Sequence, residues 1–214
     1  MRGIEAGKSR LAAVLDAASR ARLNRWLLSH TLAVIERWHG DLKRCVVVSP
    51  CDQALELARR AGAAVVREAQ GANNLNRALA LGAANTCAHG AGRMLVLPCD
   101  LPELTAESLH EFAGAAQPPR HMLLAPDAAG TGTNALLVDF AWGGEFCFGE
   151  RSCARHQACA VARSWTISIY ERREFAFDLD TPRDLAAWSQ SGAARRDVRI
   201  TPHLRYITRL EAGG

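Results

Sequence analysis

Long hydrophobic runs are missing from this chain of 214 residues. The longest ones, such as 94–98, are far shorter than the about 20 apolar residues that span a bilayer, so we exclude a membrane-spanning protein. The first residues also lack the unbroken apolar core of a secretory signal, because Glu5 and Lys8 interrupt it. We therefore expect a cytoplasmic protein that binds no membrane.

Cysteine pairs of the zinc-binding kind are missing as well. The chain has seven cysteines, an odd number, and none of them forms a C-x2-C pair. Cys147, Cys153 and Cys159 instead recur at steps of six residues, with His156 between them. A metal cluster at these residues is the alternative, but the spacing favours reduced thiols that are buried or half-buried on a helix.

Lysine is almost absent, since only Lys8 and Lys43 stand among 26 basic residues. The other 24 are arginines, whose planar guanidinium groups bind phosphate oxygens in two-point contacts, although a general compositional bias explains the same excess. The net charge is only +4 and no basic cluster alternates with aromatic residues, which argues against nucleic acid as a partner. Small phosphorylated ligands are at least as compatible with this composition.

Flexible linkers and sequence repeats are also missing, so we expect a single domain over residues 1–214. Apolar spacing predicts helices at 23–38, 52–61, 75–88, 105–115, 150–163 and 181–189, and strands at 45–49, 64–67, 93–97, 121–125, 135–138 and 165–170. Ser19 is the predicted N-cap of the first helix, Gly40 its end, and Thr181 the N-cap of the last helix. This alternation predicts an α/β fold with a mostly parallel central sheet, helices on both faces and antiparallel additions in the second half.

Acidic residues stand where ligands of such a sheet bind, at the carboxyl ends of strands. Asp100 lies between two prolines after a predicted strand, where it suits magnesium; a role in a turn or a helix start is an equal alternative. Asp178 and Asp180 are spaced i, i+2 before a predicted helix. One of them can hold a metal ion while the other caps the helix, and the alternative is that both only cap it.

Glycine and hydroxyl residues gather in two other loops. The stretch 130–133 reads Gly-Thr-Gly-Thr, which predicts an anion cradle of hydroxyls and main-chain N–H groups, or alternatively an ordinary polar hairpin. Gly149 and Ser152 predict a second anion site at a helix N-terminus, or a simple N-cap. Near the start, 7–10 concentrates cations and a hydroxyl that suit a triphosphate, but it lacks the upstream glycine of a P-loop.

In this order, the segments resemble the guanylyltransferases of coenzyme F-420 biosynthesis, which act on 2-phospholactate, phosphoenolpyruvate or 3-phosphoglycerate. The resemblance spans nearly the whole chain. It is carried by the segments 8–11, 98–102, 125–127, 130–134 and 148–149, by Ser152 and His156, and by 178–182.

The resemblance implies a nucleotidyltransferase fold of the glycosyltransferase-A-like kind, which joins GMP from GTP to the phosphate of a small three-carbon acid and releases pyrophosphate. The implied site residues are Lys8 and Asp100 for catalysis; Asp100 with Asp178 or Asp180 for Mg²⁺; Lys8, Arg10, Asn76 and Asp127 for the nucleotide; and Thr131, Thr133, Gly149 and Ser152 for the phosphorylated acid. The product passes to a transferase that acts on the deazaflavin, and a homodimer is an open alternative to a monomer.

The chemistry of the residues agrees with that reaction. A phosphate monoester has a second pKa near 6, so at neutral pH it is already mostly dianionic and needs no general base. The lack of a nucleophilic triad is therefore expected. Catalysis consists of aligning the phosphate oxygen with the α-phosphorus and neutralising the crowded charge with metal, Lys8 and arginines.

Two features depart from the family. Its members begin with an apolar strand, whereas only seven residues precede Lys8 here, so we expect this central strand to be missing and the edges of its neighbours to be exposed. Either the start codon is misplaced or the chain is impaired. The turn at 70–76 has asparagine where the family has its last glycine, and asparagine tolerates a positive φ better than most residues. Another nucleotidyltransferase of this fold and an inactive nucleotide-binding subunit are the alternative functions.

Overall fold

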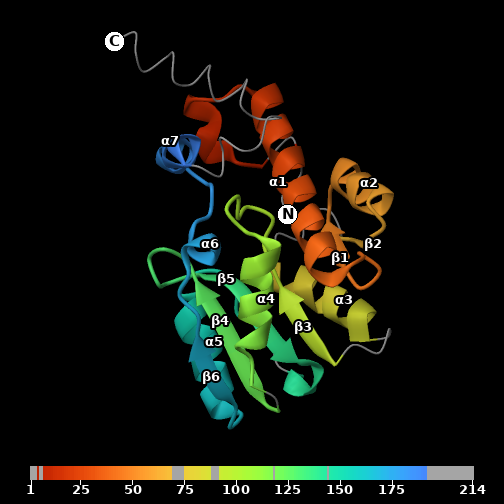
Figure 1. The fold of residues 1–214 in the computed structure, drawn as a ribbon, viewed down its shortest axis with the longest axis vertical. Coiled ribbons are helices and arrows are strands. Elements are labelled where there is room, and N and C mark those ends of the chain that lie inside the picture. The colour runs from red at the N-terminus through yellow and green to blue at the C-terminus, as the bar shows by residue number, and fades with distance from the viewer. Residues whose placement is uncertain are drawn as a thin grey trace.

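The computed structural model describes residues 4, 7–68, 75–87, 92–117, 119–143 and 145–191 (Figure 1). Its α-helices are α1 (Ala17–His39), α2 (Asp52–Arg60), α3 (Leu75–Cys87), α4 (Ala106–Gly114), α5 (Ser152–Ala162), α6 (Arg173–Ala176) and α7 (Pro182–Gln190). Its strands are β1 (Val46–Ser49), β2 (Ala64–Arg67), β3 (Arg93–Val96), β4 (His121–Pro126), β5 (Thr133–Asp139) and β6 (Thr166–Ile169). Two 3-10 helices, η1 (Ser9–Ala13) and η2 (Phe140–Trp142), complete the order. Within these ranges, every helix is too short or too polar to cross a membrane.

The predicted element boundaries lie within two residues of the observed ones, except at the start of α1. The prediction of Ser19 as its N-cap is wrong. The helix begins at Ala17, and Asp16 caps it by accepting a hydrogen bond from the Ser19 N–H at 2.6 Å. Gly40 ends α1 as predicted, in a left-handed conformation (φ 89°) that glycine adopts without strain.

Four strands form the larger sheet, in the order β3-β5-β4-β6. β5 is antiparallel to both of its neighbours and β6 is parallel to β4, so β3, β4 and β6 run in one direction. The mostly parallel α/β fold is therefore confirmed, with β5 as its antiparallel addition. Of the two strands in the second half, where antiparallel additions were predicted, only β5 is antiparallel to its neighbours, and β6 is parallel to β4. Because α5 begins beside the β4–β5 loop and runs back along the sheet, β6 starts at the same edge as β4.

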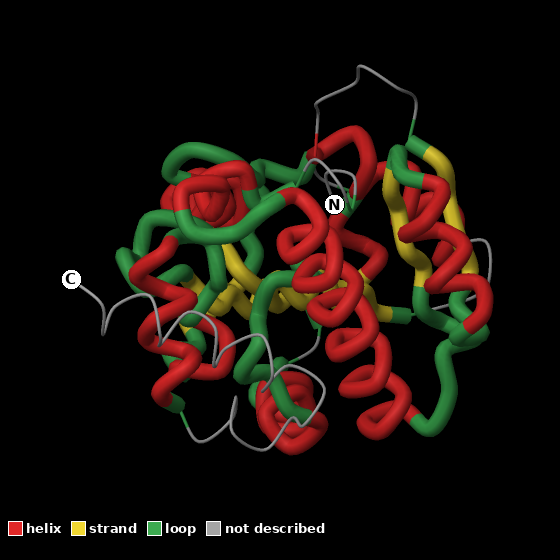
Figure 2. Tube along the Cα trace, turned by 90° about the horizontal axis from the view of Figure 1, so that it is seen from above, coloured by secondary structure: helices red, strands yellow, loops and turns green. Residues whose placement is uncertain are grey.

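Helices cover both faces of this sheet, as predicted (Figure 2). Alternate residues of a strand point to opposite faces, and β4 shows this directly. Met122 and Leu124 join a cluster with α5, whereas Leu123 and Ala125 join a cluster with α1, α4 and α6. All residues of β4 are buried, which is typical of a strand whose two faces are both covered.

β1 and β2 form a separate parallel sheet of two strands. Leu28 and Leu32 of α1 pack with Ala54 of α2 against it, and α3 approaches so closely that a Cβ added at Gly82 would lie 3.1 Å from Val48 Cγ2. In the described part of the chain, no strand joins β1 to β3, so each keeps one edge without a ladder partner. Residues 1–3 and 5–6 and the turn residues 70–74 lie outside the described residues, so the missing first strand and the altered turn stay predictions.

Candidate active site

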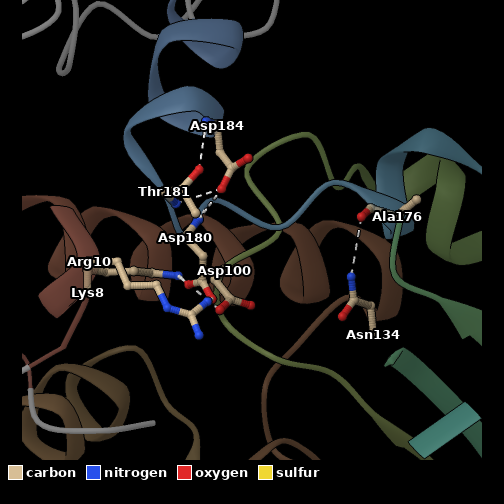
Figure 3. Close-up of polar contacts among 8 residues, drawn as sticks. All are labelled: Lys8, Arg10, Asp100, Asn134, Ala176, Asp180, Thr181 and Asp184. Carbon is tan, nitrogen blue, oxygen red and sulfur yellow. Dashed lines mark hydrogen bonds and ion pairs between the residues drawn. The ribbon is translucent and has the colours of Figure 1, made fainter. Parts of the chain in front are cut away.

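One lysine joins two acidic residues from distant parts of the chain (Figure 3). The Lys8 Nζ lies 3.0 Å from Asp100 Oδ2 and 2.6 Å from Asp180 Oδ1. Burial lowers the pKa of Lys8, but the two carboxylates outweigh burial and raise the pKa above its ordinary value, so the ammonium stays charged. Arg10 stands farther out, with Nη1 3.8 Å from Asp180 Oδ2. The structure thus brings four of the predicted site residues together.

A main-chain hydrogen bond fixes the two acid-bearing loops to each other. The Leu179 N–H donates to the Asp100 C=O at 3.0 Å. The side chains of Leu101 and Leu179 are both fully buried, which anchors each loop beside its acid. Because the bond uses main-chain atoms only, the carboxylates of Asp100 and Asp180 are left to bind a cation.

Neither Asp178 nor Asp180 caps α7, so the prediction that one or both of them cap it is wrong. Thr181, predicted correctly as the N-cap, accepts from the Asp184 N–H at 3.3 Å. Asp184 in turn accepts from the N–H groups of Asp180 and Thr181 at 3.0 and 2.6 Å. The role of Asp184 was not predicted from the sequence, although Thr-x-x-Asp before an apolar run is a capping-box signal. This box leaves the Asp180 carboxylate to Lys8.

Asp178 adds a third negative charge to this site. Burial and the charges of Asp100 and Asp180 raise the pKa of Asp178 above its ordinary value. In the unfolded chain the same carboxyl releases its proton at lower pH, so ionised Asp178 opposes folding at neutral pH. The site therefore carries more negative charge than Lys8 alone balances.

Replacing Asp178 with asparagine is expected to stabilise the protein at neutral pH, because it removes this half-buried charge. We expect the melting temperature at pH 7, measured in EDTA, to rise by about 1–3 °C. The gain should shrink as the pH is lowered, because wild-type Asp178 then takes up its proton in the folded state. Glu150→Gln, which removes an exposed charge, is the control. A lower melting temperature for Asp178→Asn at pH 7 would contradict the account.

The donor set of this site fits a magnesium ion. Asp100 and Asp180 direct one carboxylate oxygen each at the same point, which is the Lys8 Nζ. Mg²⁺ is usually bound by one or two carboxylates, with substrate phosphates and water as its other ligands. Among the described residues, no three His, Cys, Asp or Glu side chains gather closely enough to hold an ion without such help. Asp178 therefore stays a predicted ligand only.

The loop between β4 and β5 is held by Asp127. Its Oδ1 accepts from the Thr131 N–H at 2.9 Å, and its own N–H donates to the Gly132 C=O at 3.3 Å. The Thr131 C=O accepts from the Cys153 N–H at 3.1 Å, so the predicted anion cradle lies beside Ser152 at the start of α5. The two loops predicted for the phosphorylated acid are thus neighbours. The carboxylate of Asp127, predicted for the nucleotide, is engaged within the loop.

Gly132 has no room for a side chain. A Cβ there would lie 2.6 Å from Asp127 Oδ2, and the carboxylate cannot retreat without breaking its bond to Thr131. We expect Gly132→Ala to lower the free energy of unfolding by about 1–3 kcal/mol in urea denaturation. Gly114→Ala, where the added Cβ meets nothing within 4 Å, serves as the control. Asp127→Ala should rescue part of the loss in the double variant; equal stability of Gly132→Ala and wild type would refute the clash.

His156 ties Thr133 to the segment before α5. The fully buried ring accepts from the Cys147 N–H through Nε2 at 3.1 Å, and its Nδ1 lies 3.1 Å from Thr133 Oγ1. Since Nε2 accepts, the neutral ring carries its proton on Nδ1 and donates it to the threonine oxygen. Burial lowers the pKa of His156 to about 4, so the ring is neutral at physiological pH. The hydroxyl proton of Thr133 is thereby left for another acceptor.

The prediction of thiols on a helix is confirmed for Cys153 and Cys159 and wrong for Cys147, which is buried in the segment before α5. Cys153 is buried and Cys159 half-buried on α5, and both are free cysteines. Cys147 Sγ lies 3.4 Å from Cys159 Sγ. Both ring nitrogens of His156 make hydrogen bonds, one with Thr133 and one with the Cys147 N–H. Among the described residues, they therefore hold the start of β5 to the segment before α5.

Asn76 lies in a different contact network from the acids. Its side chain clamps Phe148, donating to the Phe148 C=O at 3.1 Å and accepting from the Phe148 N–H at 2.8 Å. It borders a cavity of about 660 Å³ that Trp142 and Arg155 also line, and none of the three aspartates lines that cavity. Asn76 therefore positions the residue before Gly149, and its role toward the nucleotide stays a prediction.

Asn134 connects the two halves of the site (Figure 3). Its Nδ2 donates to the C=O groups of Phe175 and Ala176, at 2.9 and 3.5 Å. Asn134 directly follows Thr133, and the end of α6 leads into 178–180. A single side-chain amide thus joins the anion cradle to the acid-bearing segment.

Comparison with known proteins identifies the family of the chain. Residues 1–205 match the family described as "Guanylyl transferase CofC like". The chain belongs to the CofC-like guanylyltransferase family. The phosphoenolpyruvate guanylyltransferase of Rubrobacter xylanophilus is 37% identical over 192 residues, which cover 90% of this chain and 92% of that relative. The 3-phospho-D-glycerate guanylyltransferase of Phenylobacterium zucineum is 33% identical over 207 residues, covering 96% and 94%.

The fold of this CofC-like chain also occurs in a solved structure. A protein from Desulfovibrio desulfuricans, named as a nucleotide-diphospho-sugar transferase, aligns with a TM-score of 0.72 and covers 98% of this chain and 94% of its own. At 16% sequence identity, this likeness concerns the fold alone. As a CofC-like guanylyltransferase, the chain is a nucleotidyltransferase, in agreement with the resemblance found in its motifs.

Proposed function

We propose that the protein transfers GMP from GTP to the phosphate of a small phosphorylated three-carbon acid in coenzyme F-420 biosynthesis. The observation that carries the proposal is the convergence of Lys8, Arg10, Asp100 and Asp180 in one site of a CofC-like guanylyltransferase. The named relatives are guanylyltransferases of phosphoenolpyruvate and of 3-phospho-D-glycerate, and both compounds belong to this substrate class. 2-Phospho-L-lactate is the third candidate.

The reaction needs positioning and charge neutralisation. An oxygen of the acid's phosphate forms a bond to the α-phosphorus of GTP, and the bond from that phosphorus to the oxygen of the leaving pyrophosphate breaks. Two unit charges about 4 Å apart repel by roughly 4 kcal/mol at an effective dielectric of 20, so two polyanions meet only among cations. Lys8 and Arg10 supply positive charge from one side. Asp100 and Asp180 would hold Mg²⁺, which supplies further positive charge at the phosphates.

The neighbouring loops suit the phosphorylated acid. Thr131 and Ser152 lie on segments joined by a main-chain hydrogen bond, and Thr133 has a hydroxyl proton left for an acceptor. Gly149 follows Phe148, the residue that Asn76 holds, and precedes Ser152. Its φ of 116° is one that glycine tolerates. A phosphate dianion here needs donors and no general base, and these groups are donors.

The test uses the full chain with GTP, Mg²⁺ and each of the three acids. We expect pyrophosphate release with at least one acid, and much slower release when ATP, CTP or UTP replaces GTP. Failure with every acid would refute the proposal. GTP binding without turnover would instead support a non-catalytic nucleotide-binding subunit. A cytoplasmic place, a homodimer and transfer of the product to a deazaflavin-modifying enzyme belong to the same proposal.

A further inference from the structure

The Lys8 ammonium lies where a divalent ion bridging Asp100 and Asp180 would lie. Its Nζ contacts one oxygen of each carboxylate, at 3.0 and 2.6 Å. An ion that binds both oxygens at about 2.1 Å must lie between them, and two cations cannot occupy that space. Binding of the ion through these two oxygens and the observed position of Lys8 therefore exclude each other.

We propose that Lys8 is the resident counter-ion of this site and that a divalent ion displaces it, so that its ammonium moves to the phosphates of the nucleotide. The inference rests on the proposed function, because it takes Asp100 and Asp180 as the ligands of the nucleotidyltransferase ion. It adds that one lysine first neutralises Asp100 and Asp180 and then neutralises the phosphates of the substrate.

Among the described residues, Lys8 is the cation that contacts both carboxylates. Its side chain is 8% exposed and makes both short contacts, whereas Arg10 is 74% exposed and reaches a single carboxylate at 3.8 Å. Lys8 is also free to move at its end. It begins η1 in a left-handed conformation (φ 58°), and four methylene groups separate its backbone from Nζ. The ammonium can therefore change partners while η1 stays in place.

The first test measures binding of Mn²⁺ alone, by calorimetry, to the full chain without nucleotide. We expect Lys8→Met to bind Mn²⁺ about tenfold more tightly than wild type or better, because the competing cation is gone. Lys43→Met is the matched control: it removes the chain's other lysine, which is exposed, and should bind as wild type does. Equal affinity of Lys8→Met and wild type would overturn the proposal.

The second test uses wild-type protein, so it does not depend on the folding of a variant. Because the chain has only two lysines, acetylation by an amine-reactive ester can be followed at each by mass spectrometry. In EDTA, Lys43 should react and Lys8 should be protected; saturating Mn²⁺ should speed the reaction of Lys8 by about tenfold, toward the rate of an exposed amine. GTP added with the metal should protect Lys8 again.

The outcomes separate this inference from the proposed function. If calorimetry shows that Mn²⁺ binds but Lys8 stays protected, the displacement is wrong while the guanylyltransferase proposal stands. If neither wild type nor Lys8→Met binds Mn²⁺, with or without GTP, the ion site itself is wrong and both proposals fall.

Discussion

Replacing Asp100 with asparagine is expected to lower the turnover number of pyrophosphate release by a factor of about 10²–10³. The amide keeps the size of the side chain but removes the negative charge that faces the cation position at the centre of the site. The main-chain bond from Leu179 to residue 100 does not involve the side chain, so the loop should keep its place. The measurement is steady-state release with GTP and the preferred acid.

Asp180→Asn should act in the same way, because both carboxylates serve one cation. For that reason the double variant should lose much less than the product of the two single losses. Asp41→Asn removes a charge that pairs with the exposed Lys43 and His39 away from the site, so it should turn over like wild type. If Asp100→Asn turned over as fast as wild type, the Asp100 carboxylate would have no part in catalysis.

Replacing His156 with alanine is expected to lower the free energy of unfolding by about 3 kcal/mol or more. The change empties a fully buried position and leaves the Cys147 N–H and the Thr133 hydroxyl without their partner. It also removes the ring that packs edge-on against Phe148. Urea denaturation at pH 7 measures the loss. His110→Ala on the exposed side of α4 is the control and should unfold like wild type.

The same histidine sets a pH dependence. The unfolded ring has its ordinary pKa of 6.5, whereas burial lowers the pKa of folded His156 to about 4. At a pH between these two pKa values, the ring is protonated in the unfolded state and neutral in the folded state. Stability therefore falls as the pH is lowered through this window. His156 should therefore contribute about 3 kcal/mol to the stability that wild type loses between pH 7 and pH 4. His156→Gln should lack this part of the loss; an unchanged pH profile would contradict a buried neutral ring.

Local signals in the sequence were sufficient for most of the helices and strands. The strand at 64–67 and the helix bounded by Thr105 were predicted because apolar spacing and capping act over a few residues. The N-cap of α1 was assigned wrongly because Asp16 and Ser19 are both good caps and only the geometry decides between them. The order β3-β5-β4-β6 was beyond reach, since strand pairing depends on contacts between distant segments.

The candidate site shows the same division. Residue type and position pointed to Asp100, Asp180 and Lys8, because acids at strand ends and a cation near the start suit a bound nucleotide. The family resemblance already implied that Asp100 and an acid of 178–180 meet around one ion. The contact of Lys8 with both carboxylates was not predicted, since it depends on the Leu179 bond and on the capping role of Asp184. Asn76 and Asp127 have the polar groups expected of residues that bind a nucleotide. In the structure, the side chains of both accept hydrogen bonds from main-chain N–H groups nearby.

The bond between the Leu179 N–H and the Asp100 C=O has a consequence for how this site can diversify. A hydrogen bond between main-chain groups does not depend on which side chains the two segments carry. New chemistry can therefore be installed at positions 100 and 180 by exchanging the side chains alone, with their spacing inherited intact. For enzyme engineering, positions 100 and 180 can therefore carry metal-binding side chains of other types.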